Sequence, residues 1–171
     1  MRAMKGFTLV EVLVAISILA ISAGLIFTLF HAMVTLVPES SSRLEAYYLA
    51  QEGVEIARNV RDTNFAKIVA AEPGINWLDG LDACEAGCEA DYKSEGLVPT
   101  TDRFLLFSGG FYEYGGSGEE TRFKRTISVD PEGGDPLTAT KADVEVQVSW
   151  EERGRTHTVQ VSTQIHNWLE F

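Results

Sequence analysis

One carboxylate, Glu11, directly precedes a long apolar run, and it is the residue of this sequence that most clearly requires a charged partner. The run from Val12 to Val37 contains no Asp, Glu, Lys or Arg. A carboxylate at the centre of a membrane helix costs about 2–3 kcal/mol on insertion scales, and less near the interface. Glu11 therefore needs a cation. If the chain were cut just before Phe7, the new α-amine of a neighbouring copy could pair with it in a medium of low dielectric constant.

The apolar run is long enough to cross a membrane. Its 26 residues would rise about 39 Å as a helix, and the hydrocarbon core is about 30 Å thick. Arg2 and Lys5 precede it and would hold the N-terminus on the cytoplasmic side, so that the rest of the chain faces outward. A secretory signal peptide also begins with basic residues, but its apolar core is only about 7–15 residues long. A plain signal anchor would explain the span but not Glu11.

The segment Lys5-Gly6-Phe7-Thr8-Leu9-Val10-Glu11, followed by this apolar stretch, resembles the class III signal of type IV prepilins. The resemblance implies a leader over residues 1–6, cleavage between Gly6 and Phe7, and N-methylation of Phe7. Glu11 then takes the fifth mature position, where that family has a glutamate. Gly6 has no side chain, which lets a membrane protease approach its carbonyl closely. The resemblance covers about the first forty residues.

A prepilin-like signal implies a structural role and a set of partners. The expected function is a subunit of a type IV pilus or related filament, and major pilin, minor pilin, secretion pseudopilin and DNA-uptake pseudopilin all stay open. The partners it implies are a prepilin peptidase, other pilin subunits, and the inner-membrane platform and motor ATPase of an assembly machine. The expected location is the cytoplasmic membrane, with one span and the C-terminal domain outside, and then an extracellular or periplasmic filament. The alternative is a single-pass sensor or adhesin that does not polymerise.

Two cysteines, Cys84 and Cys88, are four residues apart. A zinc site needs about four ligands, and the three histidines are too distant in sequence to complete one with this pair. In a compartment outside the cytoplasm we expect a short-loop disulfide, with two free thiols as the alternative. The histidines are expected to pack against neighbouring helices or to lie on strands: His31, His157 and His166.

No catalytic set is present, so we expect no enzymatic activity and no cofactor. The sequence has neither a Gly-x-Ser-x-Gly elbow nor a His-Glu-x-x-His motif. The acidic turn Asp130–Asp135 lacks EF-hand spacing, and we expect a solvated turn there, with calcium as the alternative. A net charge of −11 disfavours nucleic-acid binding. A small basic cluster is expected to lie on a solvated strand face: Arg122, Lys124 and Arg125.

The apolar run is expected to continue into a second, amphipathic helix. Pro38 should end or kink the first helix, because proline lacks a backbone donor. Ser42 and Glu45 have the spacing of a capping box that would open a helix over about 42–62. Apolar residues recur there at three- and four-residue steps: Leu44, Tyr47, Tyr48, Val54, Ala57 and Val60. Whether the first helix unwinds near Gly24 in a filament stays open.

The sequence pattern after residue 63 predicts a loop region followed by a sheet. Residues 64–103 are acidic and mixed, and we expect a loop pinned by the disulfide and anchored by Trp77 and Leu78. From residue 104 to 167 the pattern turns to strands: a hairpin of 104–107 with 111–114, then alternating segments at 143–151 and 158–167 around Gly154. Strands with one apolar face predict an antiparallel sheet covered on one side by the helix. Trp168, Leu169 and Phe171 should tuck the C-terminus against this core.

The expected fold class is therefore α+β and pilin-like, with a long N-terminal helix packed on an antiparallel sheet. Its expected parts are a cleaved leader (1–6), a transmembrane and assembly helix (7–37) and an extracytoplasmic globular domain (38–171).

Overall fold

A computed structural model describes residues 6–82, 84 and 86–169, with only the backbone described at 35–38. Arg2 and Lys5 of the expected leader and Phe171 lie outside the described residues. One long helix, α1 (Leu9–Val69), precedes all the strands. The strands pair antiparallel throughout, so the predicted α+β class is confirmed.

Helix α1 continues across Pro38, where we expected an end or a kink. A proline removes one backbone donor and crowds the preceding turn, but the backbone hydrogen bonds before and after it can maintain a continuous helix. Ser42 is consequently an interior helix residue and is buried, so the predicted capping box at Ser42 and Glu45 was wrong. The helix also runs on to Val69, seven residues beyond the expected end.

The chain divides into two compact units, one ending at Ser42 and the other running from Arg43 to Phe171. The second unit contains the rest of α1 and every strand. The two are described separately below.

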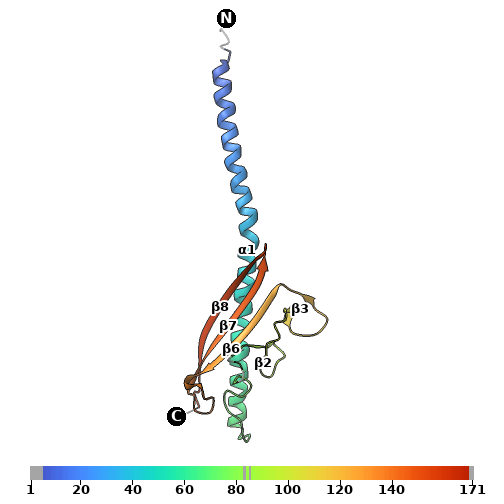
Figure 1. The fold of residues 1–171 in the computed structure, drawn as a ribbon, viewed down its shortest axis with the longest axis vertical. Helices are drawn as coiled ribbons and strands as arrows, with labels where there is room; N and C mark the ends of the chain where they lie inside the picture. Colours follow the sequence, from blue (N-terminus) through green and yellow to red (C-terminus); the bar gives the residue numbers. More distant parts are fainter. Residues whose placement is uncertain (1–5, 83, 85, 170–171) are drawn as a thin grey trace. The chain divides into compact units, whose positions relative to one another are not determined.

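The larger sheet of the second unit has the strand order β2-β1-β6-β7-β8. Its long members are β6 (Phe123–Pro131), β7 (Lys141–Glu152) and β8 (Arg155–His166). Trp150 lies opposite both Phe123 on β6 and His157 on β8. Arg153 and Gly154 form the turn between β7 and β8, and both have positive φ. Figure 1 shows these three strands side by side, crossing the same stretch of α1.

The core lies between one face of this sheet and α1. Along β7 every second residue is buried, from Ala142 to Trp150, as the alternation predicted. On the helix the buried face contains small residues, among them Ala46, Ala50 and Ala57. These small side chains let the helix backbone come close to the strands. The predicted helix face was therefore partly wrong: three of its apolar members lie exposed on the other side, namely Leu44, Tyr47 and Tyr48.

Residues 70–122, as far as they are described, contain five short strands, two of which lie in the segment 64–103 that we expected to be a loop. They contain β1 (Cys88–Glu89) and β2 (Val98–Pro99), which extend the large sheet. They also form a second sheet of order β4-β3-β5, from β3 (Leu106–Ser108), β4 (Phe111–Glu113) and β5 (Glu119–Glu120). The predicted hairpin is confirmed with shorter strands, 106–108 and 111–113 in place of 104–107 and 111–114, and Phe107 pairs with Tyr112.

The expected anchors of this region behave as predicted. Trp77 and Leu78 are buried, and the Trp77 indole donates to the Ala139 carbonyl over 3.1 Å. Near the C-terminus Leu169 packs on the core, while Trp168 meets Phe65 edge to face with ring centroids 4.6 Å apart. A single 3-10 turn, η1 (Glu132–Gly134), follows β6.

Candidate assembly site at the start of α1

Thr8 caps the first turn of α1, and Glu11 belongs to that turn. The Glu11 amide donates to Thr8 Oγ1 over 3.3 Å, and the Val12 amide donates to the Thr8 carbonyl over 3.2 Å. Thr8 and Glu11 have the Thr-x-x-Glu spacing of a capping box, a signal that our sequence argument missed. The positive end of the helix dipole stabilises a carboxylate in this turn. Glu11 thus has a local structural role besides any pairing with another chain.

The bond between Gly6 and Phe7 lies before the helix begins. Phe7 is 82% exposed, and a Cβ placed on Gly6 would meet no atom of the described residues within 4 Å apart from its chain neighbours. A protease can reach such a bond without first unwinding a helix. The two residues predicted for processing therefore lie in an accessible segment, five and four residues before Glu11.

The helix that follows is apolar on all sides. A window of α1 near the N-terminus has a mean hydropathy of 2.6 with none of it buried, so by length and composition this helix could cross a membrane. Its hydroxyl groups are satisfied within the helix. Ser17 donates to the Leu13 carbonyl and Ser22 to the Ile18 carbonyl, each over 2.8 Å. Such bonds lower the cost of placing hydroxyl groups in lipid.

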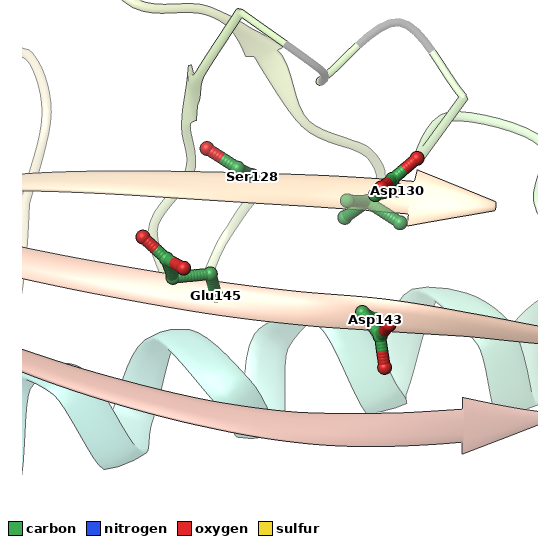
Figure 2. Close-up of a pocket in the computed structure, with 5 residues that line it drawn as sticks. Ser128, Asp130, Asp143 and Glu145 are labelled. Atoms are coloured by element: carbon green, nitrogen blue, oxygen red, sulfur yellow. The ribbon is translucent and has the colours of Figure 1, made fainter. Parts of the chain in front are cut away.

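A shallow hollow of about 460 Å³ lies on the outer face of the large sheet. Figure 2 shows Ser128 and Asp130 on β6 beside Asp143 and Glu145 on β7, with α1 on the other side of the strands. All three carboxylates are exposed to solvent. Within the described part of the chain no group of three His, Cys, Asp or Glu side chains is arranged to hold a metal ion.

The acidic turn after β6 uses its carboxylates on its own chain. Glu132 pairs with Lys141 over 2.9 Å. Asp135 accepts from the Leu137 amide and the Thr138 hydroxyl, each over 3.0 Å. These bonds hold the connection between β6 and β7.

Three buried carboxylates lie elsewhere, in positions that the sequence did not reveal: Glu89, Asp91 and Glu113. Arg103 pairs with Glu89, and Lys93 pairs with Glu113. Hydrogen bonding to Glu89 and to Glu113, respectively, raises the pKa of Arg103 and of Lys93. For Glu89 and Asp91 the only sequence signal was the acidic character of residues 64–103, which gives no indication of burial.

Asp91 closes a tight local network. Its carboxylate accepts from the Tyr114 amide over 2.8 Å, and also from the Lys93 amide and the Ser94 hydroxyl. Burial alone would raise the pKa of Asp91, but these hydrogen bonds outweigh burial and lower it. The network ties the segment after β1 to the segment after β4.

Arg125 is the most unexpected charged residue. Its side chain points to the buried face of β6 and is 1% exposed, so the prediction that it lies on a solvated strand face was wrong. Its guanidinium donates to the Leu49 carbonyl over 3.1 Å and the Ala90 carbonyl over 2.6 Å, and lies 3.4 Å from Glu52. It thus bonds α1 to the segment after β1. The alternation of Phe123, Arg125 and Ile127 was the signal that could have located it.

The remaining candidates form no catalytic arrangement in the described residues. Cys84 and Cys88 are joined by a disulfide, so neither is a free nucleophile. His157 stacks on Trp150 with ring centroids 5.2 Å apart, and His31 meets Phe27 at 4.7 Å. Both histidines therefore have aromatic packing partners.

Comparison with known protein families gives one match. Residues 1–27 match the family model described as the prokaryotic N-terminal methylation motif. Neither a curated protein nor a solved structure matches the chain. The matched residues include Gly6, Phe7 and Glu11, on which the resemblance to type IV prepilins was based. The N-terminal segment of this chain is therefore the class III signal of type IV pilins and pseudopilins, and it supports a pilin-like protein.

Proposed function

We propose that this chain is a subunit of a type IV pilus or a related filament. A prepilin peptidase removes residues 1–6, Phe7 is N-methylated, and the mature subunit is anchored by α1 until it is assembled. The observation that carries this proposal is the match of residues 1–27 to the methylation motif, and Gly6, Phe7 and Glu11 lie within the matched residues. The motif also suggests a structural protein and not a catalytic one.

The apolar helix supplies the driving force for assembly in this proposal. Large side chains from Leu9 to Val34 are exposed around the helix. Such a surface is stable either in lipid or against other apolar helices. In a filament the helices of neighbouring subunits would cover one another, and close packing with van der Waals contact would replace lipid.

Glu11 sets the register between neighbouring subunits. Its carboxylate and the Phe7 amine of an adjacent subunit would form an ion pair within the apolar helix bundle. A charge left alone there is costly, whereas a paired one is tolerated. Misaligned subunits would leave both charges unpaired, so the pair favours one axial offset.

The N-terminus of the mature protein tests the processing step. Mass spectrometry of the protein purified from its natural source should find a chain that begins at N-methylated Phe7. Gly6→Val should accumulate the precursor, because a branched side chain blocks close approach of the protease. A mature protein that retains Met1 would instead support a membrane-anchored sensor or adhesin that does not polymerise.

Substitution of Glu11 tests the pairing step. Glu11→Gln keeps the size and polarity of the side chain but removes its charge, and Glu11→Ala removes both. Both proteins should be cleaved and inserted, and both should enter purified filaments at about a tenth of the wild-type level or less, the loss that removal of a buried ion pair would give. Glu11→Asp, which keeps the charge, should assemble better than Glu11→Gln. Normal assembly of Glu11→Gln would show that charge pairing is not needed.

A further inference from the structure

The Cys84–Cys88 disulfide is enclosed by the folded second unit. Both cysteines are 0% exposed and belong to the hydrophobic core. Gly87, between them in the chain, is buried too, and a Cβ placed on it would lie 2.6 Å from Thr126 Cγ2 on β6. Thiol–disulfide exchange requires a thiolate to reach a sulfur directly. In the closed fold this bond can therefore be neither reduced nor formed by exchange, so it must form before the unit closes around it.

The ring that this disulfide closes holds β1 against β6. The Cys84 carbonyl accepts from the Val129 amide of β6 over 3.3 Å. Cys88 lies opposite Ile127 of β6 on one side and Pro99 of β2 on the other. Strand β1 itself has two residues, so its own pairing supplies few hydrogen bonds, each of modest net strength. The place of β1 on the sheet consequently depends on the ring.

Three buried charged groups depend in turn on where β1 lies. Directly after the ring, Glu89 pairs with Arg103, and the Ala90 carbonyl accepts from Arg125 over 2.6 Å. Asp91 follows and is the centre of the network described above. If β1 left the sheet, Arg125 would lose one of its acceptors within the core, and a buried charge that loses a partner is costly. Attachment of β1 and closure of this network are therefore one event.

The rest of the second unit does not need β1 for its strand pairing. Strand β6 pairs with β7 along Phe123–Pro131, and β8 pairs with β7 along Arg155–His166. Helix α1 packs closely on β7 at Gly53, and Arg125 keeps its bonds to α1 within this core. Three long strands with one apolar face covered by a helix are enough for independent stability.

We propose that the Cys84–Cys88 disulfide is a redox latch on the second unit. With both thiols reduced, α1 and the three long strands fold, but β1, β2 and the network of Glu89, Asp91 and Arg125 stay open. Oxidation attaches β1, closes the network and encloses the bond. The latch leaves this edge of the sheet open in a reducing compartment and closes it outside the cytoplasm. This inference concerns the second unit alone and does not depend on filament formation.

The partner that closes the latch is an oxidant that carries an exchangeable disulfide. The thiolate of one cysteine attacks that disulfide and forms a mixed disulfide, which releases one sulfur of the partner as a thiolate. The thiolate of the other cysteine then displaces the second sulfur of the partner. Two electrons pass to the partner, whose two sulfurs leave as thiols with the two protons that the cysteines give up.

Hydrogen exchange compares the open and closed forms of the full-length protein in detergent micelles. The dithiol form is made by unfolding the second unit in urea with dithiothreitol and refolding it with the reductant present, so that the two forms differ only in the oxidation state of the two sulfurs. The Thr100 amide donates to the Gly87 carbonyl, and the Tyr114 amide donates to Asp91. Both amides should exchange about tenfold faster or more in the dithiol form, whereas the amides of β7 should stay within about twofold.

Equal exchange of Thr100 and Tyr114 in the two forms would overturn the latch, because β1 would then stay attached without the disulfide. An equal rise at Val146 of β7 would overturn it as well, since it would show a general loss of stability. The double variant Cys84→Ala with Cys88→Ala is the control. It should show the open pattern with and without oxidised glutathione, and a closed pattern in it would also contradict the proposal.

Rates of thiol exchange test whether closure encloses the bond. Oxidised glutathione should oxidise the refolded dithiol form within about tenfold of the rate for the chain unfolded in urea, because the edge is open. Dithiothreitol should reduce the folded disulfide form about a hundredfold or more slower than the unfolded one, because the sulfurs are enclosed. Mass spectrometry after alkylation with iodoacetamide measures both rates. Slow oxidation of the dithiol form, or fast reduction of the folded disulfide form, would rule out the latch.

Discussion

Arg125 shows how one side chain can hold three segments together. It lies on β6, and its guanidinium bonds the Leu49 carbonyl in α1 and the Ala90 carbonyl after β1. The Tyr114 hydroxyl donates to the Arg125 carbonyl over 2.9 Å, which adds a link to the segment after β4. The Ala90 carbonyl would be left without this donor if Arg125 were replaced, and a buried unpaired acceptor costs about 1–3 kcal/mol.

We therefore predict that Arg125→Met lowers the free energy of unfolding by about 2–4 kcal/mol, because a buried donor to two carbonyls and a partner of Glu52 is lost. Lys124→Met is the matched control. Lys124 is the next residue on the same strand, but its partner Asp102 is largely exposed, and such a pair contributes about 0–1 kcal/mol. Urea denaturation of both variants would measure the difference. Equal loss in the two would show that the buried guanidinium has no special role.

The lowered pKa of Asp91 predicts that the folded protein loses stability in acid. Its pKa in the folded protein lies below the ordinary value near 3.9, because hydrogen bonds from Tyr114, Ser94 and Lys93 outweigh its burial. A carboxyl group whose pKa is lower in the folded than in the unfolded state stabilises the fold at any pH above its unfolded-state pKa. That contribution disappears as the pH falls through the folded-state pKa, so the loss of stability should occur below about pH 4.

Asp91→Asn should accordingly cost about 1–2 kcal/mol at pH 7 and should unfold with a weaker dependence on pH between about pH 4 and pH 2. Glu145→Gln is the control, since Glu145 is exposed on the outer face of the sheet. Urea midpoints at several pH values would compare the two. A pH dependence of Asp91→Asn identical to that of the wild type would remove Asp91 from this account.

At the scale of elements, the packing of α1 on the sheet depends on Gly53. A Cβ at this position would lie 2.8 Å from Val146 Cγ1 and 3.2 Å from Arg125 Cδ. Alanine favours a helix over glycine by about 1 kcal/mol, but overpacking a core costs about 1–3 kcal/mol. Here the neighbour is a buried β-branched side chain, so we expect the cost to exceed the gain.

Gly53→Ala should thus destabilise the second unit by about 1 kcal/mol, despite its better helix propensity. Gly24→Ala adds the same methyl group to the same helix where no other atom lies within 4 Å, and should not destabilise that unit. Thermal unfolding followed by near-ultraviolet circular dichroism would report on the packed aromatic residues. A rise in the midpoint of Gly53→Ala would mean that α1 can shift away from β7.

The sheet and the start of the chain were the parts best predicted from sequence. Strict alternation over 143–151 located β7, because one face of that strand is buried and the other is wet. The helix was harder. Its buried face contains small residues such as Ala46 and Gly53, whereas the sequence drew attention to Tyr47 and Tyr48, which are exposed. Hydrophobicity alone does not reveal which face lets two backbones come close.

The buried polar groups could not be predicted, because their partners are distant in sequence. Glu89 meets Arg103, and Tyr112 donates its hydroxyl to Glu45. Burial and the bond to Glu45 raise the pKa of Tyr112. The candidate assembly residues, by contrast, could be proposed from the sequence, since Gly6, Phe7 and Glu11 lie in one continuous segment.

At the scale of the whole molecule, processing and folding concern different units. The proposed cleavage and pairing residues lie before Val12, and the hydrophobic core of the second unit begins at Ala46. Defects in maturation and defects in stability should therefore be separable by mutation.

We predict that Gly6→Val blocks maturation and filament formation, yet leaves the thermal midpoint of the second unit within about 1 °C of wild type, since it changes no contact in the core. Gly53→Ala should do the reverse: its midpoint falls by several degrees, as about 1 kcal/mol implies for a domain of this size, while mass spectrometry finds normal cleavage before Phe7. Measuring both properties in both variants completes the comparison. A lowered midpoint in Gly6→Val would show that the retained leader destabilises the globular unit, in which case cleavage would alter the fold as well as expose the Phe7 amine.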